Sequence, residues 1–321
     1  MSSAGDYVRF LDTEYLAEYV AHGGAAVKFV VPYDDEEAQR FSSLLLEAST
    51  GRGYVSARVD AVTTRIHLMD QVLFDIARHI DWRSLARIAV RDAVTAAGFP
   101  PPDGIDAPDA LAVDRLAAHH SMDVHELTRD VNRELQQRIM RDHTMAQEFR
   151  VAMLRLCQAE LVTGQVTEAE REAVVAWLCG ELRQMSVLRS AMIFRRIGRH
   201  NARSLLFSLA HWLGITGHTG LVIELDIRRL GFARRPLPEE RNGLYYTKAA
   251  LLDAYELLRQ LVDNTDELSR CVVVVVAAPE FLTDDARGVS AYQALRLRVH
   301  SEVHDRSREN PFASLIRLAA P

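Results

Sequence analysis

Two apolar runs lead into carboxylates, one into a single aspartate and one into four acids, at the places where the side chains of a nucleotide site would lie. GLVIELD (Gly220 to Asp226) ends on Asp226, and this is the form of a Walker B segment, whose aspartate holds magnesium. AVKFVV (Ala26 to Val31) leads into four consecutive carboxylates over residues 34–37, where a P-loop protein carries its phosphate-binding loop. The sequence therefore indicates the positions of two parts of an NTPase site, a magnesium ligand and a phosphate loop.

The segment after the first apolar run lacks the residues that bind phosphates. A P-loop strand leads into G-x-x-x-x-G-K-[ST], but residues 32–41, PYDDEEAQRF, contain no glycine, lysine, serine or threonine. Because helix N-termini favour anions, the acids are expected to cap the following helix, and they would repel a triphosphate. Ile227 stands where ATPases of this type carry a water-activating glutamate. We therefore expect a degenerate Walker A at 32–41 and assign no catalytic residue.

Apolar runs and helical spacing predict the elements that position these residues. Near-continuous Val/Ile runs are typical of strands covered by helices on both faces. A helix over about 35–50 and a strand over 53–59 complete a β-α-β unit with the first run, and this crossover is long enough for parallel pairing. The fold class is α/β, with a parallel sheet flanked by helices. The predicted strands are 26–31, 53–59, the Walker B-like 220–226 and a sensor-like 271–277; further helices are predicted within 5–22, 66–80 and 247–266.

The predicted strands are interrupted by a long segment with helical spacing only. FPPPDGIDAPDA, within 99–110, is rich in Pro, Asp and Gly and indicates a linker. From 111 to 213 apolar residues recur at i, i+3 and i+4. We expect an N-terminal half of the α/β domain over 1–98, the linker 99–110, a large helical insert over 111–213 and a C-terminal half over 214–321.

Five segments follow one another along the chain: GGAAVKFVV with Phe41 and Leu44, GRGYVSARVDA, RIGRHNARSLLFSLAHWLGITGHTGLVIELD, AYELLRQLVDN and AAPEFLTDDARGVSAYQALRLR. In this order they resemble the ATP-binding proteins of bacterial BREX-type phage-defence systems, a P-loop family related to AAA-type ATPases. Against that family's pattern, Ala38 stands where the P-loop lysine would be and Gln39 where the serine or threonine would be. The resemblance implies a P-loop NTPase-like fold of the AAA/STAND type in which Asp226 is a vestigial cofactor-binding residue.

Composition restricts the classes of protein that remain. The formal net charge is −6 and the pI about 6.1, so the chain as a whole lacks the basic excess of a dedicated nucleic-acid binder. No secretory signal and no apolar stretch long enough to span a bilayer are evident, and we expect a cytoplasmic protein without membrane contact. Three widely spaced cysteines, Cys157, Cys179 and Cys271, are expected to be buried free thiols.

Two further clusters could carry function. An arginine-rich cluster around RRIGRH could contact a DNA backbone or an acidic partner, or it could be one solvated helix face. A histidine- and acid-rich stretch over 119–126 favours a helix start capped by Ser121 over a metal site. The arginines of the first cluster are Arg189, Arg195, Arg196, Arg199 and Arg203.

The sequence favours a non-catalytic subunit, a pseudo-ATPase, that acts as scaffold or regulator in an anti-phage defence complex. Its partners would be other defence-system proteins, including a catalytically competent ATPase, and no cofactor is expected for the isolated chain. Two alternatives stay open. In one, a partner completes an ATP–Mg site in trans, with Arg287 or Arg296 acting as an arginine finger. In the other, the chain is a DNA-binding module that uses the arginine-rich cluster.

Overall fold

The computed structural model describes residues 3–101, 111–232, 242–300 and 310–319. The chain forms two compact units, a sheet unit (Met1–His79 with His218–Pro321) and a helical unit (Ile80–Gly217). Most of the predicted linker 99–110 lies outside the described residues. The unit boundaries fall near 80 and 217, whereas the sequence analysis placed its insert at 111–213, and that finer division stays a prediction.

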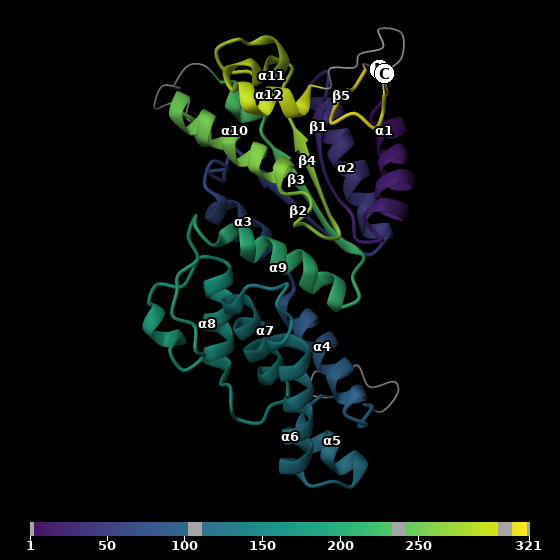
Figure 1. The fold of residues 1–321 in the computed structure, drawn as a ribbon, viewed down its shortest axis with the longest axis vertical. Helices are drawn as coiled ribbons and strands as arrows, with labels where there is room; N and C mark the ends of the chain where they lie inside the picture. The colour runs from purple at the N-terminus through teal and green to yellow at the C-terminus, as the bar shows by residue number, and fades with distance from the viewer. Residues whose placement is uncertain (1–2, 102–110, 233–241, 301–309, 320–321) are drawn as a thin grey trace. The chain divides into compact units, whose positions relative to one another are not determined.

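The sheet unit contains a five-stranded parallel sheet in the order β2-β3-β4-β1-β5, as far as the chain is described. This confirms the predicted α/β class and the four predicted strands (Figure 1). β5 was missed because three residues are too few for a periodic signal. The strands are β1 (Ala25–Val31), β2 (Tyr54–Asp60), β3 (Gly220–Asp226), β4 (Cys271–Val276) and β5 (Leu315–Arg317).

Helices cover both faces of the sheet. On one face Val30, Val222 and Val274 pack in a core with the first three helical elements of the chain. On the other face the ring of Phe29 stacks on Phe281, with centroids 5.9 Å apart. The elements of this unit are α1 (Ala4–Phe10), the π-helix η1 (Leu11–Tyr19), α2 (Asp35–Gly51), α3 (Met69–Arg78), η4 (Arg228–Gly231), α10 (Lys248–Asp263), α11 (Glu280–Thr283), η6 (Val289–Ala291) and α12 (Gln293–Val299).

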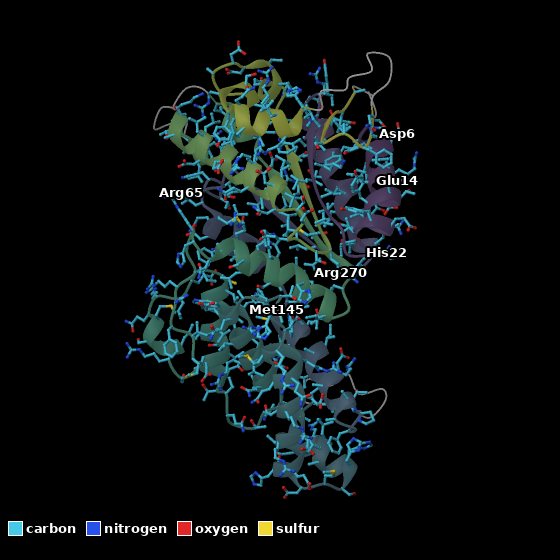
Figure 2. The ribbon with its side chains drawn as sticks, in the orientation of Figure 1. Asp6, Glu14, His22, Arg65, Met145 and Arg270 are labelled. Atoms are coloured by element: carbon cyan, nitrogen blue, oxygen red, sulfur yellow. The ribbon has the colours of Figure 1, made fainter. Side chains whose placement is uncertain are left out.

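Two side-chain contacts are found in the sheet unit away from the carboxyl ends of the strands, one at their amino ends and one beside the edge strand β5. Figure 2 shows Arg270 beside the amino ends of the strands, and its Nη1 donates to the carbonyl of Ala21 at 2.6 Å. On β1 the buried Lys28 donates from Nζ to the carbonyl of Phe312 at 2.7 Å, just before β5. This contact helps to hold the short edge strand against β1. Burial lowers the pKa of Lys28 to about 8. The carboxyl ends of the strands lie at the opposite end of the sheet from Arg270 and carry the candidate functional site.

The helical unit differs from the predicted continuous run of helices in one stretch. After α8, only a short 3-10 helix lies before α9, so the expectation of helix across residues 179–201 is wrong. A second correction concerns Ser121, which ends α5 at φ 53°, while Asp123 caps α6 by accepting from the amides of His125 and Glu126. The elements are α4 (Trp82–Ala96), α5 (Val113–His120), α6 (Val124–Leu135), η2 (Gln136–Met140), α7 (Gln147–Glu160), α8 (Glu168–Leu178), η3 (Met185–Leu188) and α9 (Ala202–Ile215).

Candidate functional site

A crevice lies at the carboxyl ends of the strands, where ligands of open α/β sheets bind. The chain leaves β1 towards β2 on one side and leaves β4 towards β5 on the other, so the topology switches between these adjacent strands. A pocket of about 460 Å³ lies here, and we call it the carboxyl-edge crevice. A second pocket of about 510 Å³ shares Asp35, Arg228 and Phe232 with it. The crevice is lined by Pro32, Tyr33, Asp34, Asp35, Arg228, Gly231, Phe232, Ala277, Ala278, Pro279 and Glu280.

An acidic side chain caps the helix N-terminus that faces this edge. Asp34 is the N-cap of α2, and its Oδ1 accepts from the amide of Glu37 at 2.8 Å. Glu37 is buried, and its Oε1 accepts from the amide of Ala4, the first residue of α1, at 2.8 Å. The predicted capping of α2 is confirmed for Asp34, while Asp35 and Glu36 lie beside it in the first turn. The free amides that would attract a phosphate therefore lie among carboxylates.

The two positions compared with the P-loop lysine and hydroxyl residue lie inside α2. Ala38 is 1% exposed and belongs to the hydrophobic core between α1, α2 and the sheet. Gln39 is exposed and lines the second pocket. Only Pro32, Tyr33 and Asp34 connect β1 to α2, so few backbone amides are available to surround a phosphate between the strand and the helix.

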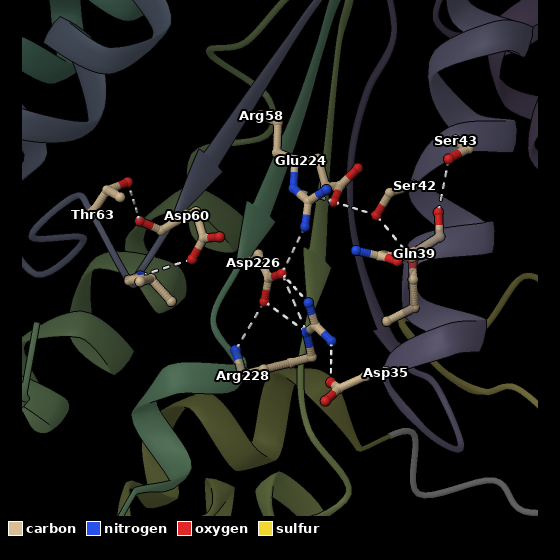
Figure 3. Close-up of polar contacts among 12 residues, drawn as sticks. Asp35, Gln39, Ser42, Ser43, Arg58, Asp60, Thr63, Glu224, Asp226 and Arg228 are labelled. Atoms are coloured by element: carbon tan, nitrogen blue, oxygen red, sulfur yellow. Dashed lines mark hydrogen bonds and ion pairs between the residues drawn. The ribbon is translucent and has the colours of Figure 1, made fainter. Parts of the chain in front are cut away.

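Asp226 forms an ion pair with Arg228 at the end of β3. The Arg228 guanidinium donates from Nε to Asp226 Oδ1 at 3.0 Å and from Nη2 to Oδ2 at 2.6 Å. The Arg228 amide also donates to Oδ1, at 3.2 Å. Figure 3 shows the same guanidinium reaching Asp35 at the start of α2 through Nη1. Arg228 thus connects the end of β3 to the first turn of α2 across the crevice.

Glu224 on β3 and Arg58 on the neighbouring strand β2 form a second acid–base contact, two residues before Asp226. Glu224 and Asp226 are two residues apart on β3 and so lie on the same face, which is the face covered by α2. Arg58 of β2 contacts Glu224 at 3.3 Å and donates to Asp226 Oδ2 at 3.0 Å. Ser42 of α2 donates its hydroxyl to Glu224 at 2.6 Å (Figure 3). This cluster was not predicted from the sequence, although a glutamate inside an otherwise apolar strand is a visible signal.

The two buried carboxyl groups have pKa values shifted in opposite directions. Burial raises the pKa of Glu224 above its usual value of 4.5, against the opposing effects of Ser42 and Arg58. Burial also acts to raise the pKa of Asp226, but hydrogen bonds from Arg228 and its charge lower it below 3.8 overall. The hydrogen bonds to Asp226 raise the pKa of Arg228. The structure therefore holds Asp226 as a carboxylate already neutralised by arginine.

The raised pKa of Glu224 gives a pH-dependent prediction. A carboxyl group whose pKa is higher in the folded state stabilises the fold at low pH, and this contribution is lost as the pH rises through the folded pKa. Glu224→Gln removes this titration and leaves a carbonyl that can accept from Ser42. Relative to wild type, the free energy of unfolding of Glu224→Gln should increase as the pH rises above about 4.5. Urea unfolding at several pH values measures the difference, and an opposite slope would contradict it.

The other residues singled out from the sequence lie on other elements of the two units. Arg189, Arg195, Arg196 and Arg199 lie in the irregular stretch between η3 and α9, and Arg203 lies in α9 of the helical unit. Arg287 is 7% exposed, with its guanidinium donating to the carbonyls of Leu230 and Tyr246. Such a buried guanidinium does not fit a trans-acting arginine finger.

Arg296 is exposed on α12 and remains the other candidate for that role. Within the described residues, no group of three or more His, Cys, Asp and Glu side chains could hold a metal ion. The three cysteines are buried and free, as expected. In the same described part of the chain, no helix combines the length and the apolar character needed to cross a membrane.

The parallel sheet, its helical layers and the Walker B-like strand define a P-loop NTPase-like α/β protein. The sequence model of a family described as BREX system ATP-binding protein BrxC/D matches residues 110–320, which is most of the chain. The chain belongs to this family. The matched range includes Asp226 and Arg228 and excludes the acidic run 34–37. Neither a curated protein nor a solved structure matches.

Proposed function

We propose that this chain is a non-catalytic subunit of a BREX defence complex, in which it acts as a scaffold or regulator. The observation that carries the proposal is the ion pair between Asp226 and Arg228. It places a guanidinium where a magnesium ion would have to meet the aspartate. Membership of the family supports the assignment to the defence system and to this fold. Because Arg228 already pairs with the carboxylate of Asp226, a structural role is favoured over catalysis.

The coordination chemistry of magnesium supports this view. Mg²⁺ demands near-octahedral oxygen ligands at about 2.0–2.1 Å, and both oxygens of Asp226 already accept hydrogen bonds from arginines. A metal would have to displace Arg228 from a carboxylate whose side chain is 4% exposed. The triphosphate would then lie against the acidic first turn of α2. The displacement of Arg228 and the contact with the acidic turn both oppose the binding of magnesium and ATP. Residues 32–41 contain no lysine that would compensate for them.

A second candidate is an ATP-binding subunit whose site is completed by a partner. The family's description as ATP-binding and the crevice of about 460 Å³ favour it. Exposed Arg296, or an arginine supplied by the partner, would then provide the missing positive charge. In either case the partners are other proteins of the defence system, one of them a competent ATPase, and the complex works in the cytoplasm.

Phage resistance tests the proposal directly. A host that carries the defence system with Asp226→Asn in this chain should resist phage as well as wild type, because asparagine keeps the shape of the side chain and removes the magnesium-binding charge. The assay is the efficiency of plating, with a strain lacking the gene as the sensitive control and immunoblots to show equal protein amounts. Loss of resistance at a wild-type protein amount would contradict the proposal and favour a working nucleotide site.

A further inference from the structure

One stretch of the helical unit carries positive charge without any acid. No aspartate or glutamate occurs from residue 182 to the end of this unit at residue 217, although the whole chain has a formal net charge of −6. All arginines of this stretch lie in residues 183–203, which we call the arginine segment. Arg183, Arg189, Arg195, Arg196 and Arg199 are exposed. Positive charge is therefore concentrated locally on an acidic protein.

Alternating burial fixes the arginine segment against the helical unit. Leu188, Ala191, Ile193 and Ile197 are buried. The indole of Trp177 donates to the carbonyl of Arg195 at 2.9 Å. These anchors are irregularly spaced and residues 189–201 form no helix, so the solvated helix face considered from the sequence does not exist for the arginines that precede α9. The segment is instead a held loop that presents the intervening side chains outward.

Apolar side chains are presented together with the arginines. Phe194 is 63% exposed and lies directly before Arg195 and Arg196. Met192 is 60% exposed and has φ 62°, a left-handed backbone that is unfavourable for a bulky side chain. Strained backbone of this kind persists where the surroundings fix it, often at binding sites. Water contact with both side chains is costly, and a ligand that covers them would remove this cost.

We propose that the arginine segment binds single-stranded nucleic acid, with Arg195, Arg196 and Arg199 on the phosphates and Phe194 stacked on a base. Proteins that bind single strands combine a positive groove with aromatic side chains on which bases stack. The bases of a duplex are already stacked and paired, so Phe194 would gain nothing there. An acidic protein would satisfy the arginines but would not need an exposed aromatic ring next to them in the sequence.

The contacts of the arginines within the fold leave them able to bind phosphates. Arg195 contacts Glu148 at 3.4 Å, but its side chain is 74% exposed, and such surface pairs contribute little. Arg196 donates to the carbonyl of Arg183 at 2.7 Å, which orients the guanidinium without neutralising it. This inference does not depend on whether the carboxyl-edge crevice binds nucleotide.

Fluorescence anisotropy with the full chain tests the charge contribution. The probes are a labelled oligo-dT of about 20 nucleotides and a duplex of equal length, titrated from about 50 to 200 mM salt. Wild type should bind the single strand more tightly. Arg195→Glu/Arg196→Glu should weaken binding by roughly tenfold or more at low salt and reduce the salt slope by about 1.4, since each contact contributes about 0.7.

The matched control is Arg129→Glu/Arg133→Glu on α6, which makes the same charge change at side chains 69% and 59% exposed. It should bind like wild type. If both double variants lose affinity equally, the effect is one of net charge and the proposed site is wrong. The proposal would also be overturned if the chain bound the duplex as tightly as the single strand or more tightly. It would likewise be overturned if the chain bound neither probe and bound an acidic protein instead.

Substitutions of Phe194 separate stacking from hydrophobic contact. Phe194→Leu should weaken binding to oligo-dT by roughly 5- to 100-fold, as expected for one lost stacked base, whereas Phe194→Trp should restore it. Because the side chain is exposed, both variants should unfold at the wild-type temperature. Identical affinities for the leucine and tryptophan variants would contradict a stacking role.

Discussion

Mixing the purified chain with magnesium and ATP is expected to leave its thermal unfolding midpoint unchanged and to release no phosphate. A ligand present at 100 times its Kd stabilises a protein by about 2.7 kcal/mol, which would shift the midpoint by several degrees in a chain of this size. No such shift is expected, because Arg228 occupies Asp226 and the first turn of α2 carries Asp35 and Glu36. Each unscreened like-charge contact adds about 1 kcal/mol even in water.

Two variants make this result interpretable. Asp35→Asn/Glu36→Gln removes two exposed charges and keeps the N-cap Asp34, so it should fold normally. If repulsion is part of the barrier, this variant should bind ATP more strongly than wild type without hydrolysing it. A saturable midpoint shift in the wild-type chain that Asp226→Asn abolishes would contradict the prediction and show that the carboxyl-edge crevice is a functioning metal–nucleotide site.

The sheet was predictable because its strands are locally encoded. β1, β3 and β4 are almost fully buried, so each appears as a short apolar run. The place of Asp226 could be predicted from its position at the end of such a run. β5 could not be predicted, because its three residues depend on pairing with β1 and on the contact of Lys28 with the carbonyls of Phe312 and Ala313.

The contacts of the site depend on register and could not be read from spacing. Arg58 lies opposite Glu224 only because β2 pairs with β3 in this alignment. Arg228 was visible two residues after Asp226, but a sequence does not show whether such a side chain turns back to its neighbour or outward to a ligand. The irregular stretch before α9 was mistaken for helix because its apolar residues, 191–194 and Ile197, form too short a run to separate the two periods.

The ion pair between Arg228 and Asp226 is expected to contribute more to stability than any surface pair in the sheet unit. Arg228→Met should lower the free energy of unfolding by about 2–3 kcal/mol, because it leaves a buried carboxylate with only partial compensation. The loss should stay below that of a fully isolated charge, since Arg58 and the backbone amide of residue 228 still donate to Asp226. Arg58→Met should cost less than about 1 kcal/mol, because that side chain is 41% exposed.

A double-mutant cycle by urea unfolding at neutral pH isolates the pair. Asp226→Asn/Arg228→Met should be less destabilised than the sum of its two single variants by about 1–3 kcal/mol, because neither partner is then left as an uncompensated charge. Arg296→Met on α12 serves as the control for removing an exposed arginine and should change stability by less than about 0.5 kcal/mol. Additive single effects would show that Arg228 does not compensate Asp226. The aspartate would then be available to a metal, and the structural argument for a non-catalytic subunit would fail with it.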